Sequence, residues 1–189
     1  MRKVKASVIL AILLLMPACV PSLQPLFTEK DAVFEPGLVG AWVSEDEEGN
    51  TRIWTLKKSG TKAYELVDVV EDGEPAKFEA RLVRLGERAF LDVYPEEPPI
   101  DNDFYKLHLI PAHTFVRITL DGDLMTAAMM DDGWLRQALD SGELTIAHQR
   151  LGKGSVLLTA ATEDLQELVV KNCDTPGAFT DATVFRRNR

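Results

Sequence analysis

Short runs of alternating apolar and polar residues recur from Leu38 to the end of the chain, separated by segments rich in glycine, proline and acidic residues. Such a run buries one face of a β-strand and leaves the other face in water. The residues of segment 78–83 alternate in this way. We expect strands at Leu38–Ser44, Thr51–Lys57, Lys62–Val70, 78–83, Ala89–Tyr94, Phe104–Ile110, Thr114–Leu120, Leu124–Met130, Glu143–Arg150, Ser155–Ala160 and Thr183–Arg187.

Two segments instead follow the period of a helix. Asp131 is placed to cap a short helix that contains Trp134 and ends at Gly142, and Thr162 is placed to cap a second helix near the C-terminus. Strands in sequential order, interrupted by a loop helix and followed by a C-terminal helix, are typical of an all-β fold. We expect a mostly antiparallel meander that closes into an up-and-down barrel of about 8–10 strands.

The first residues of the chain have the pattern of a signal peptide. Arg2, Lys3 and Lys5 precede an unbroken apolar run from Val8 to Met16. That run is too short to cross a bilayer as a helix, which takes about 20 residues, and it matches the apolar region of a secretory signal. No later segment reaches the length of a membrane-spanning helix.

The sequence Leu15-Met16-Pro17-Ala18-Cys19 resembles the lipobox of bacterial lipoproteins. The resemblance implies cleavage before Cys19, lipidation of that cysteine and attachment to a membrane through it; an ordinary secretory cleavage near Ala18 is the alternative. In that family an Asp after the cysteine retains the protein at the inner membrane, so Val20 points to the outer membrane. We therefore expect a signal peptide at 1–18, a lipidated cysteine and tether at 19–36, and a barrel domain at 37–189 of the cell envelope.

The start of the first strand, Gly40-Ala41-Trp42, resembles the Gly-x-Trp signature of lipocalins. The resemblance implies that Trp42 closes one end of a barrel and that a late basic residue, Arg186 or Arg187, packs across it. The Thr-Asp-Tyr motif of the middle of that family is missing. The alternative is that Trp42 is a core aromatic of another β fold. The chain is also similar to small bacterial lipoproteins with a lipocalin-like domain.

Composition excludes several kinds of partner. The formal net charge is −9, so the phosphates of a nucleic acid would repel the chain. Two cysteines and three histidines do not supply a disulfide framework or a rich metal centre, and we expect no metal and no cofactor. Cys173 is expected to be a small buried residue.

The sequence carries none of the common catalytic motifs, so we do not expect an enzyme. If the barrel has a cavity, the candidates for its lining are His108 and His148, Met125 and Met129, and Trp134 of the loop helix. Such a cavity would hold a small apolar or amphipathic ligand. The alternative is a structural or protein-interaction lipoprotein with a filled barrel. His113 lies two residues after Pro111, and we expect it in a turn.

Overall fold

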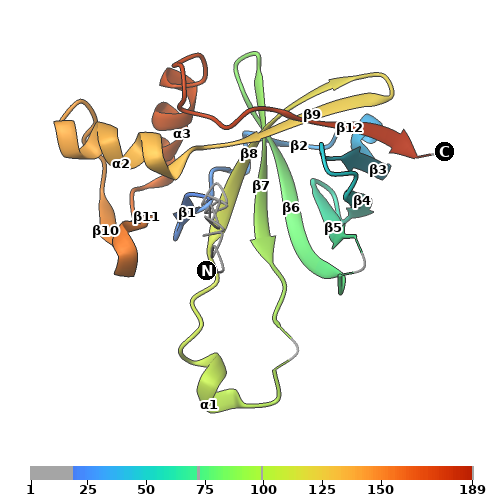
Figure 1. The fold of residues 1–189 in the computed structure, drawn as a ribbon, viewed down its shortest axis with the longest axis horizontal. Coiled ribbons are helices and arrows are strands. Elements are labelled where there is room, and N and C mark those ends of the chain that lie inside the picture. Colours follow the sequence, from blue (N-terminus) through green and yellow to red (C-terminus); the bar gives the residue numbers. More distant parts are fainter. Residues whose placement is uncertain (1–18, 72, 99, 189) are drawn as a thin grey trace, which may run out of the picture.

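The computed structural model describes residues 19–71, 73–98 and 100–188. The signal peptide expected at 1–18 therefore lies outside the described residues. Within them, eight strands close into a barrel (Figure 1). They are β3 (Gly40–Glu45), β4 (Thr51–Ser59), β5 (Ala63–Val70), β6 (Ala76–Leu85), β7 (Arg88–Pro95), β8 (His113–Asp121), β9 (Leu124–Met129) and β12 (Thr183–Asn188).

Each barrel strand from β3 to β9 pairs antiparallel with the next one along the chain. Strand β12 closes the barrel between β9 and β3. The expected all-β fold with an antiparallel meander is thus confirmed. Four short strands lie outside the barrel: β1 (Pro21–Ser22), β2 (Ala32–Val33), β10 (His148–Arg150) and β11 (Val156–Leu158).

Helix α2 (Asp132–Ser141) begins and ends at the residues that the sequence predicts. The Asp131 carboxylate accepts a hydrogen bond from the Trp134 backbone N–H at 2.7 Å. Gly142 ends the helix in the left-handed conformation, at a φ of 78°.

Helix α3 (Thr162–Lys171) also lies where it is expected, but its cap differs. The N-cap is Ala161, which offers no side-chain hydrogen bond, and Thr162 is the first helical residue. The Thr162 hydroxyl instead donates to the Pro25 carbonyl at 2.8 Å. The hydroxyl therefore attaches α3 to the N-terminal segment. The chain also forms two short 3₁₀ turns, η1 (Pro36–Leu38) and η2 (Gly152–Gly154).

Strands β6 to β9 are buried on both faces over part of their length. Leu82 and Leu91 point into the barrel, whereas their neighbours Val83 and Phe90 belong to a second hydrophobic cluster outside it. This outer cluster packs between the barrel wall and the layer of α2, α3, β1 and β11 (Figure 1). Burial on both faces explains why these strands carry adjacent apolar residues instead of a strict alternation.

The expected strand at Phe104–Ile110 is wrong. The Asn102 side chain accepts a hydrogen bond from Tyr105 N at 2.9 Å and caps α1 (Asp103–Lys106). Residues 107–110 are part of a loop. Strand β7 pairs directly with β8, and the chain between them, which includes this segment, extends beyond the ends of both strands (Figure 1). Of the strand expected at Glu143–Arg150, only His148–Arg150 forms.

Residues 20–36, expected to serve as a tether, are instead packed on the barrel; we call them the lead-in. Leu26 is completely buried, and Gln166 of α3 donates to its carbonyl at 2.9 Å. Ala32 and Val33 pair with β6. The proline content that suggested a linker reflects an irregular path over the barrel wall rather than freedom from it.

One barrel end, where β3 begins and β12 ends, is closed by Trp42; we call it the closed end. The Trp42 indole is buried and donates to the Leu38 carbonyl at 2.9 Å. The Arg187 guanidinium lies over the indole, 4.2 Å from the ring centre, and donates to the Val39 carbonyl at 2.8 Å. Arg187 is therefore the basic residue across Trp42. Arg186, the other candidate, points outward because neighbours on a strand alternate.

Replacing Gly40 by alanine is expected to lower the free energy of unfolding by about 1–3 kcal/mol. Gly40 has a φ of +140°, and an added Cβ would lie 2.6 Å from Arg187 Nη1. Urea unfolding at 25 °C measures the change. Gly152→Ala is the control, because a Cβ at Gly152 meets nothing within 4 Å. Equal values for both variants would contradict the argument.

Candidate functional site

The barrel interior, where a ligand was expected, is filled with side chains. Trp54 stacks on Phe185 with ring centres 4.7 Å apart, and the Tyr64 hydroxyl donates to the Glu35 carbonyl at 3.1 Å. Trp54 Nε1 is buried and has no hydrogen-bond partner among the described residues. The interior cluster is Leu38, Trp42, Trp54, Leu56, Tyr64, Leu66, Ala80, Leu82, Leu91, Val93, Val116, Ile118, Met125, Ala127 and Phe185.

The structure does not bring the two expected histidines together. His108 lies on the exposed loop after α1, where its Nδ1 contacts the Phe104 carbonyl at 2.8 Å. His148 lies on β10, outside the barrel, where its Nδ1 contacts the Ile146 carbonyl at 2.8 Å. Neither ring points into the barrel, because neither segment is a barrel strand.

Two of the other three candidates lie together. Met125 is part of the filled interior, and Met129, at the end of β9, packs against the same cluster. Trp134 packs against the outer hydrophobic cluster. Helix α2 therefore lies against the side of the barrel and does not place Trp134 over its mouth.

The barrel end opposite Trp42, where β7 ends and β8 begins, carries polar inward-facing residues; we call it the open end. Arg52 makes two hydrogen bonds to Asp68, at 2.8 and 2.7 Å, which raise the pKa of Arg52 above its ordinary value. The exposed Cys19 thiol contacts the Met129 sulfur at 2.9 Å. The residue expected to be lipidated thus lies at the open end.

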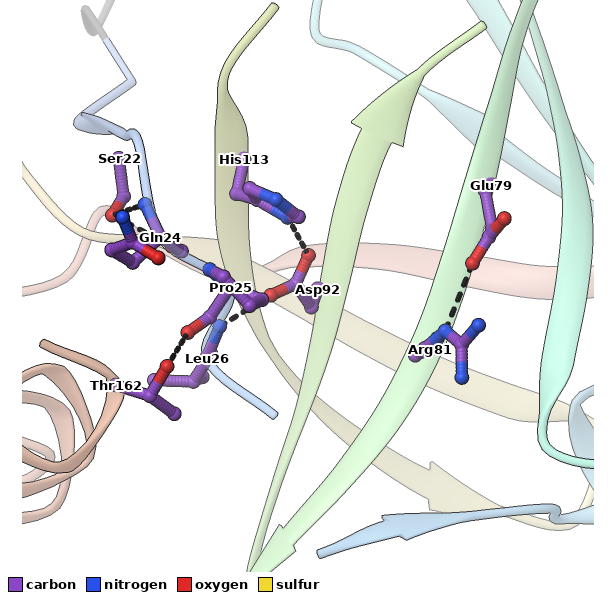
Figure 2. A network of polar contacts seen from close by, with 9 residues as sticks. All are labelled: Ser22, Gln24, Pro25, Leu26, Glu79, Arg81, Asp92, His113 and Thr162. Carbon is purple, nitrogen blue, oxygen red and sulfur yellow. Dashed lines mark hydrogen bonds and ion pairs between the residues drawn. The ribbon is translucent and has the colours of Figure 1, made fainter. Parts of the chain in front are cut away.

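A second group of polar side chains surrounds a cavity of about 210 Å³ on the outer wall of the barrel. Figure 2 shows its centre, where Asp92 of β7 accepts from the backbone N–H of Leu26 and contacts the ring of His113. The cavity is lined by Phe27, Glu79, Arg81, Asp92, Tyr94 and His113.

Asp92 is the buried acid of this cavity. Its residue is 2% exposed, and both carboxylate oxygens are used: Oδ1 lies 2.6 Å from His113 Nδ1, and Oδ2 lies 2.6 Å from Leu26 N. A buried carboxylate needs partners of this kind, because an unpaired charge is costly to remove from water. In a neutral His113 ring, a proton on Nδ1 donates to Asp92 and leaves Nε2 as an acceptor.

The remaining lining residues come from β6, β7 and the lead-in. The Tyr94 ring lies 4.5 Å from the His113 ring, between centres. Arg81 donates to Glu79 at 2.9 Å and lies over the Phe27 ring. The arrangement can accept a hydrogen bond or a proton from a small molecule. None of the six lining residues is a serine, threonine or cysteine, and the one hydroxyl of the lining is the phenol of Tyr94.

Sequence reasoning missed this site. His113 was expected in a turn, whereas it is the first residue of β8 and is partly buried. A signal was present: Asp92 interrupts the apolar run of β7, and a carboxylate inside a strand buried on both faces must find a partner. Which histidine supplies that partner depends on the β7–β8 register, which the sequence does not reveal.

Other parts of the surface offer less chemistry. A cavity of about 340 Å³ lies between α3 and segment 143–147, and its lining mixes polar residues with Leu144, Ile146, Ala147 and Leu168. Over residues 19–71, 73–98 and 100–188, no group of three or more His, Cys, Asp and Glu is placed to hold a metal ion. The same ranges contain no helix with the length and apolar character needed to cross a membrane.

Cys173 is expected to react with iodoacetamide on the order of 100-fold more slowly in the folded protein than in urea. Its residue is 3% exposed, and burial raises the pKa of its thiol above the ordinary value. Mass spectrometry of the Cys173 peptide after timed labelling at pH 8 measures both rates. Rapid labelling in the absence of urea would contradict the buried position.

Comparison of the chain with protein-family models, curated proteins and solved structures finds no match in any of the three.

Proposed function

We propose that this chain is a lipid-anchored lipoprotein of the bacterial cell envelope, at the outer membrane. Its barrel is filled with side chains and holds no ligand, and the protein has a structural or protein-interaction role. The observation that carries the choice is the barrel interior, which is packed with buried apolar side chains. Neither of the two cavities described above is lined by a residue of that cluster. A ligand carrier needs a concave apolar site, typically of about 300 Å³ or more.

The proposed anchor rests on the sequence Leu15–Cys19, which has the order of a lipobox, and on the position of Cys19. Cys19 is an exposed residue, so an acylated cysteine is compatible with the packing of the residues that follow. Stable attachment takes two or more acyl chains, which lipoprotein processing supplies.

The proposed relation to lipocalin-like domains is supported by two features of the fold. The barrel is a meander closed by the last strand, and a late basic residue, Arg187, lies over Trp42 of the Gly-x-Trp segment.

The anchor is tested by the mass of the N-terminal peptide of protein purified from cell membranes. We expect a peptide that begins at Cys19 and carries acyl chains. A full-length Cys19→Ser variant should leave the membrane fraction or remain unprocessed. An unmodified Cys19, or cleavage at another peptide bond, would overturn the anchor.

The filled barrel is tested separately by native mass spectrometry after gentle purification. We expect the mass of the chain with its acyl groups and no further component, also after exposure to envelope lipid extract. A discrete additional mass that is released on denaturation would overturn the filled barrel and identify a class of ligand.

A further inference from the structure

The loop between β7 and β8, residues 96–112, carries the most exposed large apolar side chains of the described chain; we call it the β7–β8 loop. Phe104 is 74% exposed, Leu107 81% and Ile110 74%. Tyr105 and Leu109 between them are exposed as well. Contiguous large apolar residues on an exposed surface mark a site of interaction with a protein, a membrane or a ligand.

The β7–β8 loop has a defined local structure. The Asn102 side chain caps α1, and the His108 ring packs edge-on against Phe104 at 5.0 Å between centres. Lys106 pairs with Glu97 at 2.8 Å. These contacts lie within the loop, and Figure 1 shows α1 extending away from the barrel strands.

Cys19 lies at the same end of the barrel as this loop. The loop joins the end of β7 to the start of β8, and Pro21 pairs with Thr114, the second residue of β8. Cys19 itself contacts Met129 at the end of β9, which runs antiparallel to β8. Residues 1–18 join the described chain at this point.

No spacer separates Cys19 from the folded domain. Val20 is 5% exposed and belongs to the outer hydrophobic cluster, and strand β1 begins at Pro21. Acyl chains on Cys19 would therefore draw the open end of the barrel directly onto the bilayer. The β7–β8 loop, which extends from that same end, would meet the lipid first.

We propose that the β7–β8 loop inserts the side chains of Phe104, Leu107 and Ile110 into the bilayer surface and so fixes the orientation of the barrel on the membrane. The proposal rests on the proposed lipid anchor for its geometry. It names a lipid surface as the partner; a protein partner for the same loop is the competing outcome.

The charges around the loop specify the kind of lipid. Exposed carboxylates surround the open end, and like charges repel anionic headgroups. We therefore expect zwitterionic lipid to be preferred over anionic lipid. The carboxylates belong to Glu45, Asp46, Glu47, Glu48, Glu71, Glu74, Glu96, Glu97, Asp101 and Asp103.

The first experiment uses an added tryptophan as a fluorescent reporter in the unlipidated chain, residues 19–189 with Cys19→Ser. This part of the chain contains both hydrophobic clusters, whose residues all lie from Val20 onward. Phe104→Trp is compared with Leu124→Trp, an exposed position at the closed end. Vesicles of phosphatidylcholine and phosphatidylethanolamine with brominated acyl chains should quench the added tryptophan at 104. The same vesicles should quench the fluorescence of the Leu124→Trp variant no more than that of the chain without an added tryptophan.

The second experiment measures binding of the same unlipidated chain to these vesicles by flotation. The pair Leu107→Asp and Ile110→Asp should reduce the bound fraction at least about tenfold, since two exposed apolar side chains are lost. The matched control is Val170→Asp with Val184→Asp, which are exposed on α3 and β12. Replacing part of the lipid by phosphatidylglycerol should weaken binding. An equal loss in both variant pairs would overturn the proposal.

The results distinguish failure of the proposed membrane contact of the β7–β8 loop from failure of the proposed lipid anchor. Quenching at 104 with an unmodified Cys19 in cells would support the loop and overturn the anchor. An acylated Cys19 without quenching at 104, in the unlipidated chain and in lipidated protein reconstituted into vesicles, would overturn the loop and leave the anchor in place. That second result would assign the apolar loop to a protein partner.

Discussion

Replacing Trp42 by alanine is expected to lower the free energy of unfolding by about 3–5 kcal/mol. The indole is completely buried, its N–H donates to the Leu38 carbonyl, and its face supports the Arg187 guanidinium. The variant loses all three interactions and leaves a cavity at the closed end. Because the whole domain is stabilised by about 5–15 kcal/mol, a large share of that stability depends on this side chain.

The measurement is urea unfolding at 25 °C, followed by fluorescence and circular dichroism. The matched comparison replaces a tryptophan by phenylalanine at two positions. Trp42→Phe removes a donor that has a partner, whereas Trp54→Phe removes a buried donor without one among the described residues. Trp54→Phe is therefore expected to cost less, by about 1 kcal/mol or more. The reverse order would contradict the structure of the closed end.

The barrel could be predicted from the sequence because its strands obey a local rule. In β4, the inward Trp54 and Leu56 alternate with partly or fully exposed neighbours, and short turns join the strands in order. A meander needs no long-range information beyond this pattern, since each strand pairs with the next.

The same rule fails where apolar residues face water. Segment 104–110 alternates like a strand, yet Phe104, Leu107 and Ile110 are exposed on a loop. Hydrophobic pattern predicts structure only when the apolar face is covered by the chain itself. In the proposal above, the cover is a bilayer, so the failed strand marks a functional surface.

The candidate sites depended on tertiary contacts that periodicity does not encode. The expected ligand residues required His108 and His148 on barrel strands, and neither segment is one. The Asp92–His113 pair arises from the β7–β8 register together with the path of the lead-in, which brings Leu26 to the same carboxylate. A composition rich in proline gave no indication that the lead-in is packed.

Burial of both faces of β6 to β9 connects the fold to the proposed function. The inner face fills the barrel, and the outer face holds α2, α3 and the lead-in. The lead-in is thereby fixed from Val20 onward, so Cys19 has one position relative to the barrel. A fixed anchor point gives the domain a defined orientation on a membrane, whereas a flexible tether would leave the orientation free.

Asp92 is one of the polar residues that attach the lead-in, and Asp92→Ala is expected to lower the free energy of unfolding by about 3–5 kcal/mol. The variant leaves His113 and the Leu26 N–H without their acceptor in a buried environment. Asp92→Asn is expected to cost less, because an amide oxygen can still accept from Leu26. Denaturant unfolding measures both variants. Asp140→Ala is the control, since Asp140 pairs with Arg150 at the surface and the change should stay within about 1 kcal/mol.

Hydrogen exchange then distinguishes a local role of Asp92 from a general loss of stability. The Leu26 amide donates to the Asp92 carboxylate, so Asp92→Ala should remove its protection even under conditions where the barrel stays folded. Amides paired between β3 and β4, on the side of the barrel away from β7, should keep theirs. If the Leu26 amide stays protected in Asp92→Ala, other contacts hold the lead-in, and the pair with His113 is then better explained as part of a ligand site than as a structural attachment. If only the lead-in is released, Cys19 loses its fixed position, and the quenching of a tryptophan at 104 in membrane-bound protein should fall with it.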